Sequence, residues 1–316
     1  MINLNLNDVE AKNHFNNIKN IIQARTKNIL KSGISIRGHK ASPFGYLRTY
    51  LVSLLDDSEL EKIITDKPEN FESTITKITR LYPDFIDESS DSHFVLYNIF
   101  IKNCYNLSGR FSKYDFISKI GRDTCPYCNR NYIYYLSKSK EIKPQIDHFF
   151  PKSKYPFLAM SFYNLIPSCQ TCNGFGAKEE KDPLKEGLIN PYLLKSSDFI
   201  FTYKPVSSKI ISTFLDKKSI TIEITKNIPG HLDVFKLKEL YELHSDHVVE
   251  LIFKSKIKYS ETYRNYLEKY KEKGLKFSEN EIDRMILGNY VMEEDIHKRP
   301  LAKLYQDIGK ELGLIK

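Results

Sequence analysis

The sequence lacks a long apolar run and a targeting segment. No stretch reaches the roughly 18 uncharged apolar residues that a transmembrane helix needs. The chain starts M-I-N-L-N-L-N-D, without the basic and apolar regions of a signal peptide. Internal repeats and low-complexity segments are also absent, which argues against a repeat architecture. We therefore expect a cytoplasmic protein that has no membrane partner.

Cysteine is scarce, with five in 316 residues, and four of the five form two C-x-x-C pairs, Cys125/Cys128 and Cys169/Cys172. Disulfides do not persist in a reducing cytosol. Two pairs of thiolates complete the tetrahedral shell that structural zinc prefers, so we predict one zinc ion here. The two pairs are separated by 40 residues, more than the roughly 15 to 20 of a zinc ribbon, so the intervening chain must hold further structure. Cys104 lies outside this pattern and is expected to be a buried apolar residue.

The composition is that of a globular protein with a basic excess. Hydrophobic residues make up 41% and aromatic residues 13%, enough to pack the cores of one to three domains. The net charge is +8, which favours a polyanionic partner. Ten basic and four acidic residues fall between 110 and 154, whereas four basic and eleven acidic residues fall between 56 and 91. The basic excess therefore surrounds the cysteine stretch, and the acidic segment is not expected to face nucleic acid.

Polar residues with catalytic potential lie between the cysteine pairs and just after them. Asp147 and His148 are adjacent, Asn164 follows 16 residues later, and Asn173 comes directly after the last cysteine. An imidazole next to a carboxylate suits a general base beside a hard divalent cation. Taken alone, Asp147 and His148 could equally be a surface turn or a satisfied core pair. Asn173 could instead cap a helix.

At these residues the sequence resembles the HNH endonucleases, whose ββα-metal motif is a hairpin and a helix around one catalytic metal. The resemblance implies that Asp147 ligates Mg²⁺ or Mn²⁺, that His148 activates water and that Asn164 orients His148 through the hairpin. It also implies that Asn173 is a metal ligand. A helix should begin near Asn173, where Gly174 and Gly176 weaken it, since each costs about 1 kcal/mol relative to Ala.

Over residues 120–195 the sequence resembles the HNH nuclease subunit of Septu-type anti-phage systems. The segments that carry this resemblance are I-D-H-F-F-P-K-S, N-L-I-P-S-C-Q-T-C-N and N-P-Y. That resemblance implies an ATPase partner and a nucleic-acid substrate, with DNA favoured over RNA. Three lysines in the same stretch are candidate phosphate contacts: Lys152, Lys154 and Lys178. As solvated surface lysines they would need no function.

The expected fold is α+β: a mainly helical chain around a central zinc-stapled ββα unit, with a small antiparallel sheet after it. We expect a helical region over 1–120, the nuclease over 121–195, and the sheet followed by helices over 196–316. Helices are predicted at 6–30, 58–64, 69–81, 92–104, 112–120, 232–273, 279–287 and 300–312. Strands are predicted at 131–136, 145–149, 164–168, 199–203, 209–214 and 219–224.

Two functions from other classes remain open at this stage. The chain could be a zinc-knuckle module that binds nucleic acid without catalysis, or an adaptor that docks an ATPase. Neither alternative gives a role to Asp147, His148, Asn164 and Asn173 together.

Overall fold

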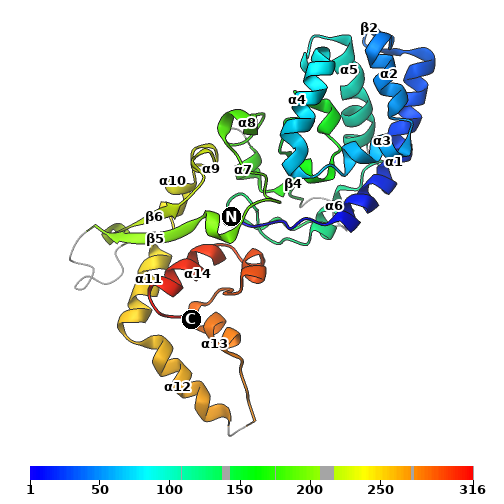
Figure 1. Cartoon of the computed structure of the whole chain (residues 1–316). Coiled ribbons are helices and arrows are strands. Elements are labelled where there is room, and N and C mark those ends of the chain that lie inside the picture. The colour runs from blue at the N-terminus through cyan, green and yellow to red at the C-terminus, as the bar shows by residue number, and fades with distance from the viewer. Residues whose placement is uncertain (108, 137–142, 175, 207–216, 272–273, 316) are drawn as a thin grey trace. The chain divides into compact units, whose positions relative to one another are not determined.

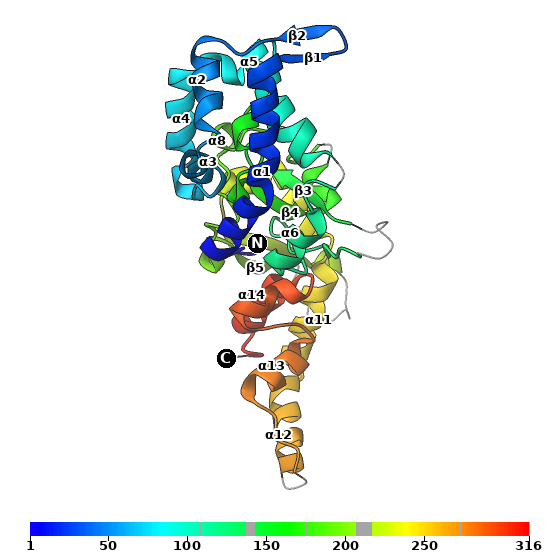
Figure 2. The ribbon, with the colours of Figure 1, turned by 90° about the vertical axis from the view of Figure 1, so that its right-hand side faces the viewer.

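The computed structural model describes residues 1–107, 109–136, 143–174, 176–206, 217–271 and 274–315 (Figures 1 and 2). The chain forms two compact units, and neither is a single continuous segment. The first unit comprises Met1–Asn3, Arg122–Tyr134 and Leu194–Lys316. The second unit comprises Leu4–Gly121 and Tyr135–Leu193. The three consecutive regions expected from the sequence, 1–120, 121–195 and 196–316, remain a prediction.

The second unit begins with the long helix α1 (Asp8–Ser32). The Asn7 side chain accepts a hydrogen bond from the Glu10 amide at 3.0 Å, which caps the helix start. The apolar residues of α1 recur near every fourth position, so they share one face of the helix, and this face is buried. Gly33 ends the helix at φ +66°, where an added Cβ would lie 2.8 Å from the Ala41 carbonyl oxygen. The helix predicted over 6–30 is confirmed.

Six further helical segments of this unit surround α1. α2 (Gly45–Ser53), α3 (Asp57–Ile64) and the π-helix η3 all contact α1, and Figures 1 and 2 show α2 and α3 beside it. The segments are α2, α3, α4 (Phe71–Leu81), α5 (Asp91–Tyr97), η3 (Asn98–Tyr105) and α6 (Lys113–Ile120), with the 3₁₀ turns η1 (Pro68–Asn70) and η2 (Pro83–Ile86) between them. The helices predicted in this part of the chain are confirmed. The chain between α1 and α2 contains a short hairpin, β1 (Ile34–Ile36) and β2 (His39–Ala41).

A second hairpin in this unit carries the candidate site. β3 (Gln145–His148) pairs antiparallel with β4 (Leu165–Ser168), with Asp147 opposite Ile166 and His148 opposite Leu165. The four-residue helix α7 (Gln170–Asn173) follows and contacts β3. The 3₁₀ turns η4 (Pro156–Leu158) and η5 (Phe162–Asn164) lie in the connecting loop, and the short helix α8 (Pro183–Glu186) comes later. Both predicted strands of this hairpin are confirmed.

The first unit is built on a two-stranded antiparallel sheet, β5 (Ile200–Pro205) and β6 (Ile220–Lys226). The third strand expected at 209–214 lies outside the described residues. α14 (Ala302–Glu311) packs on β5, while α10 and α11 pack on β6. The other elements of this unit are η6 (Ser196–Asp198), η8 (Lys217–Ser219), α9 (Pro229–Phe235), α10 (Leu237–Glu242), α11 (Ser245–Lys256), α12 (Tyr259–Lys271), α13 (Glu279–Leu287) and η9 (Glu293–Lys298).

One prediction needs correction. The segment over 131–136 is not a strand, because it pairs with the chain before Cys125 only through one isolated antiparallel bridge, Thr124 to Tyr132, in which Cys125 donates to the Asn131 carbonyl at 2.9 Å and Ile133 donates to the Asp123 carbonyl at 2.8 Å. The helices predicted over 232–273 are confirmed as α9 to α12, with left-handed residues at Lys236 and Lys258 among the breaks between them. None of the helices in the described part of the chain is long and apolar enough to cross a membrane.

Candidate functional site: a cysteine cluster and an Asp-His cavity

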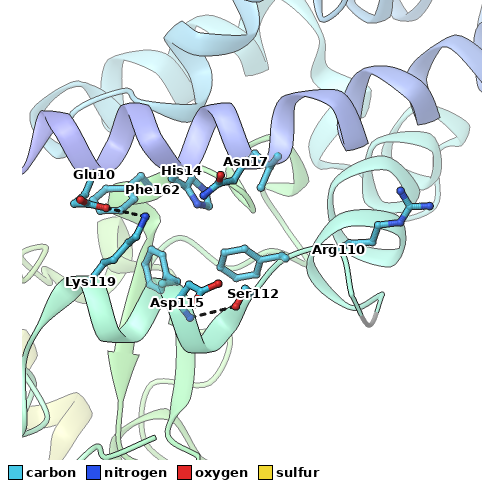
Figure 3. A pocket seen from close by; sticks show the side chains of 11 residues that line it. Glu10, His14, Asn17, Arg110, Ser112, Asp115, Lys119 and Phe162 are labelled. Atoms are coloured by element: carbon cyan, nitrogen blue, oxygen red, sulfur yellow. Dashed lines mark hydrogen bonds and ion pairs between the residues drawn. The ribbon is translucent and has the colours of Figure 1, made fainter. Parts of the chain in front are cut away.

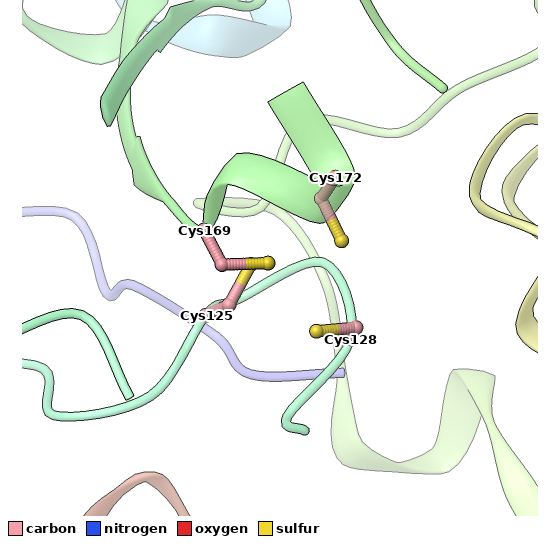
Figure 4. Close-up of side chains that lie close together, drawn as sticks. All are labelled: Cys125, Cys128, Cys169 and Cys172. Carbon is pink, nitrogen blue, oxygen red and sulfur yellow. The ribbon is translucent and has the colours of Figure 1, made fainter. Parts of the chain in front are cut away.

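The four cysteines of the two C-x-x-C pairs gather into one buried cluster. Their Sγ atoms all lie within 4.8 Å of one another. Figure 4 shows the sulfur atoms of Cys169 and Cys172, around the start of α7, pointing toward those of Cys125 and Cys128 in a tight turn. The backbone amide of Arg130 donates to Cys128 Sγ at 3.4 Å.

This donor set fits a structural zinc ion. Zinc bonds thiolates at about 2.3 Å in a tetrahedron, which puts the sulfur atoms roughly 4 Å apart. Cys125 and Cys128 are fully buried, and Cys169 and Cys172 are nearly so. Four thiolates leave a tetrahedral ion no open position, so a zinc ion here would have a structural and not a catalytic role. The buried cluster can bind a metal ion such as zinc.

The β3–β4 hairpin presents Asp147 and His148 to a cavity of about 350 Å³ within the second unit. The cavity is lined by Ile146, Asp147, His148, Pro151, Lys152, Asn173, Glu179 and Glu180. Asp147 and His148 are 2% and 4% exposed, so both are largely removed from bulk water. A carboxylate, an imidazole, an amide and an ammonium group therefore meet in one small polar space.

One ring nitrogen of His148 is hydrogen-bonded, and the other is buried without a hydrogen-bond partner among the described residues. The imidazole forms a hydrogen bond with the backbone of Ala159, whereas the buried Nε2 has no hydrogen-bond partner among the described residues. The bonded atom is therefore Nδ1, and because the bond favours the protonated ring, the Ala159 carbonyl is the acceptor. The ring of Tyr105 packs edge-on against His148 with 4.6 Å between centroids.

Several effects keep His148 neutral. Burial, followed by the positive charge of Lys152, lowers the pKa of His148 well below its usual value. Lys113 and Lys178 lower the same pKa by smaller effects. A neutral imidazole whose Nδ1–H is bound to a carbonyl has its Nε2 lone pair available to accept a proton.

Asn164 ties the long loop of the hairpin together. Its Oδ1 accepts from the Phe150 amide at 2.7 Å, and its Nδ2 donates to the carbonyls of Phe150 at 3.2 Å and Leu158 at 3.0 Å. The side chain is fully buried. Leu158 directly precedes Ala159, so this amide fixes the segment that holds His148. That geometry agrees with an orienting role, which stays a prediction.

Asn173 lies in the cavity at the end of α7. Its Nδ2 donates to Gln145 Oε1 at 2.8 Å, which orients the amide and leaves Oδ1 as the candidate ligand atom. The helix expected to begin near Asn173 instead ends there, because Gly174 adopts an extended backbone conformation. An added Cβ at Gly174 would lie 2.5 Å from the Gln170 carbonyl oxygen, so this position requires glycine. Cys169, and not Asn173, occupies the N-cap position of α7.

The three lysines proposed as phosphate contacts have different surroundings. Lys152 lines the cavity and is partly buried. Lys154 Nζ lies 2.5 Å from Asp182 Oδ2 in an ion pair. Lys178 is fully buried and donates to the Lys181 carbonyl at 2.9 Å, and burial lowers its pKa. Lys152 is thus the one whose position best suits a phosphate contact, and the role of each stays a prediction.

Sequence reasoning missed three residues at this site. Glu179 and Glu180 add two carboxylates to the cavity wall. Their place directly after Lys178, close behind the second cysteine pair, was a usable signal. Tyr105 comes from η3 and packs against His148. Nothing local in the sequence indicates that contact.

A second polar cavity of the same unit, of about 280 Å³, contains another buried histidine, His14 (Figure 3). His14 Nε2 is hydrogen-bonded to the Met160 carbonyl at 2.9 Å. Its ring lies among three phenylalanine rings at centroid distances of 5.5 to 5.9 Å: Phe111, Phe116 and Phe162. Burial lowers the pKa of His14 to about 4. This histidine is packed and bonded as a core residue.

Comparison with known proteins gives one partial similarity. No protein-family model matches the chain. No solved structure matches it. The chain is 43% identical over 56 residues, 18% of its length, to the Septu protein PtuB of Bacillus thuringiensis. It covers 21% of that protein. One segment of this chain is therefore similar to a segment of a Septu protein.

Proposed function

We propose that the chain is a metal-dependent HNH endonuclease that hydrolyses phosphodiester bonds of nucleic acid, with DNA favoured over RNA. The observation that carries the proposal is His148: a buried, neutral imidazole whose Nε2 has no partner in the described part of the chain, in one cavity with Asp147, Asn173 and Lys152. An unsatisfied buried nitrogen is costly for folding alone, so a functional reason for it is favoured.

His148 and Lys152 in the cavity and Asn164 behind it have separate parts in the proposed hydrolysis. His148 accepts a proton from the attacking water at Nε2, and the Ala159 carbonyl stabilises the imidazolium that forms at Nδ1–H. Asn164 keeps the Ala159 segment in place. Lys152 provides a positive charge for the phosphate. The expected products carry 5′-phosphate and 3′-hydroxyl ends.

Asp147 and Asn173 would hold the catalytic cation. A hard cation such as Mg²⁺ prefers oxygen ligands and keeps several waters, and a carboxylate, an amide Oδ1 and the roomy cavity meet that requirement. When bound, the cation polarises the scissile phosphate and stabilises the leaving oxygen. Asp147 lies on β3, and Asn173 lies at the end of α7. Because β3 and α7 contact each other, the two elements together position both ligands.

The cysteine cluster would hold one structural zinc ion per chain. Because a four-thiolate site contributes its binding free energy to folding, Cys169→Ser should release zinc and lower the melting temperature. Elemental analysis of the purified chain checks the metal. A chain free of zinc, or a serine variant that melts like the wild type, would refute this part.

The similarity to a Septu protein supports a role in anti-phage defence together with an ATPase partner. On this proposal the helices outside the cavity provide the docking surface. Co-expression with a Septu-type ATPase, followed by size-exclusion chromatography, should give a joint peak. Protection of cells from phage by a chain that stays alone under those conditions would contradict the partnership.

A nuclease assay tests the proposed function directly. The wild-type chain is incubated with plasmid, single-stranded DNA and tRNA, with and without Mg²⁺ or Mn²⁺, beside the His148→Ala variant. Cleavage that needs the metal and His148 is expected. Binding without cleavage in every condition would instead favour the zinc-knuckle binding module, and neither binding nor cleavage would favour the adaptor.

A further inference from the structure

A group of lysines lies beside the Asp147–His148 cavity around the ring of Tyr105. Lys113 Nζ is 4.1 Å from the centroid of that ring, and Lys152 Nζ is 5.8 Å from it. The same ring packs edge-on against His148. Tyr105 is 8% exposed, and its hydroxyl donates to the Ile146 carbonyl at 3.3 Å, so the ring is a fixed support. Two ammonium groups are thereby held next to the catalytic candidate.

Lys113 carries charge that no carboxylate in the described part of the chain pairs with. Neither Lys113 nor Lys152 forms an ion pair within the parts of the chain that the structure describes, and the carboxylates of Asp147 and Glu180 on the cavity wall offset part of the charge of Lys152. Burial lowers the pKa of Lys113, followed by the charges of Lys143 and Lys152. The charges nearest Lys113 are thus other lysines, an arrangement that is unfavourable until an anion enters.

The position of Lys113 in its helix is also unfavourable for stability. It is the first residue of α6, directly after the N-cap Ser112. The N-terminus of a helix carries partial positive charge, which disfavours a cation by about 0.3–1 kcal/mol. The contact with the Tyr105 ring offsets part of this cost and holds the ammonium group beside the cavity.

We propose that Lys113 and Lys152, gathered around Tyr105, bind a backbone phosphate of the nucleic-acid substrate next to the phosphate that enters the cavity. The inference rests on the proposed function, and it makes Lys113 a substrate-binding residue and Tyr105 a positioning residue. Ammonium groups recognise any phosphodiester backbone, so this subsite sets affinity and register and reads no sequence.

The salt dependence of binding tests the inference. Binding of fluorescently labelled single-stranded DNA, double-stranded DNA and RNA is measured by anisotropy from about 50 to 200 mM salt in the His148→Ala background, where the strands stay intact. Lys113→Met keeps the aliphatic stem on Tyr105 and removes the charge. It should reduce the slope of log K against log salt by about 0.7–0.9 and weaken binding roughly 5- to 10-fold near 0.1 M salt.

Lys102→Met is the matched control. Like Lys113, Lys102 lies over a tyrosine ring, with Nζ 5.6 Å from the centroid of Tyr97. Lys102 belongs to η3, in the same unit as Lys113. Its slope should equal that of the parent, and Lys113→Arg should restore the parent slope because the charge returns. A purely structural Lys113 would change the melting temperature and not the slope.

The outcomes separate the two proposals. If the wild type cleaves and the Lys113→Met slope equals that of Lys102→Met, the phosphate subsite is refuted while the nuclease proposal stands. If the parent binds none of the three nucleic acids and the wild type cuts none, both fail. The strand type that loses the most affinity in Lys113→Met identifies the substrate that reaches this subsite.

Discussion

Two buried histidines of the second unit, His14 and His148, bond to neighbouring residues of the same loop and yet have opposite surroundings. His14 bonds to the carbonyl of Met160, and His148 to the backbone of Ala159. In His14 the bonded atom is Nε2, and three phenylalanine rings surround the imidazole. In His148 the Nε2 has no partner among the described residues, and the ring faces a polar cavity.

The difference shows that burial and a lowered pKa do not identify a catalytic base by themselves. Both residues have a lowered pKa, and burial is the largest cause for each. What separates them is hydrogen bonding: Nε2 of His148 is buried without a partner among the described residues, whereas Nε2 of His14 is bonded to the Met160 carbonyl. The cavities do not separate the two residues, because each contains carboxylate, amide and ammonium side chains. The following variants test whether this separation holds.

The largest effect is expected at His148. Removing a general base costs about 10²- to 10⁴-fold in rate, so His148→Ala should lose measurable cleavage. Zinc content and nucleic-acid affinity should stay near those of the wild type. His14→Ala is the paired variant, and it should keep its rate per folded molecule while the melting temperature falls. Cleavage kinetics and thermal melting of both variants check the pair, and equal cleavage by His148→Ala and the wild type would remove the comparison.

Asn164 holds the loop segment that contains the hydrogen-bond partners of both histidines. Asn164→Ala leaves the amide and the carbonyl of Phe150 without this partner in a buried loop, whereas the Leu158 carbonyl still accepts from the Ser161 amide. Each buried group left unsatisfied costs about 1–3 kcal/mol, so unfolding in denaturant should show a loss of at least ~2 kcal/mol. Cleavage should fall as well, because the loop that holds His148 loosens. Asn70→Ala, at an exposed site in the same unit, is the control. Full stability of Asn164→Ala would show that the loop holds without this amide.

The smallest effect concerns the pH dependence of stability at His14. Its pKa is about 4 in the folded chain and near 6.5 when unfolded. Between pH 6.5 and 4 the unfolded chain therefore binds a proton that the folded chain does not, and the free energy of unfolding falls as the pH falls. The loss between pH 7 and pH 5 should be about 2 kcal/mol.

His14→Gln should remove this contribution, because the amide does not titrate and can still donate to the Met160 carbonyl. Denaturant unfolding at pH 7 and pH 5 measures it as a difference from the wild type. An identical pH dependence in His14→Gln and the wild type would show that His14 titrates normally.

Local patterns carried most of the prediction of the fold. The helix over 6–30 and the β3–β4 hairpin follow from periodicity, caps and strand composition, which act over a few residues. The strand expected over 131–136 was wrong because this segment pairs only at one isolated bridge, between Thr124 and Tyr132. The helices predicted over 232–273 are present, but the left-handed residues Lys236 and Lys258 that separate some of them could not be placed, because the sequence gives no reliable sign of them.

The candidate site divides in the same way. Asp147, His148 and Asn173 could be found because they are close in sequence to the cysteines. Tyr105 could not, since its contact with His148 joins distant segments. The burial of Lys178 could not be predicted either, because a charged residue gives no sign of the carbonyl that will receive its ammonium group.

The loop between β3 and β4 is fastened at three places, and this bears on how a ligand would meet it. Asn164 binds it near both ends, His93 bonds to the Ser153 carbonyl, and Asp182 accepts from Lys154 and from the Tyr155 hydroxyl. The conformational entropy of these residues is therefore lost when the chain folds, not when a ligand binds. Lys152 lies in the middle of this preorganised segment. A nucleic-acid strand that enters the cavity meets a site that already has its final shape. The affinity of the chain for that strand should therefore depend on charge and shape complementarity, and little on ordering of the loop.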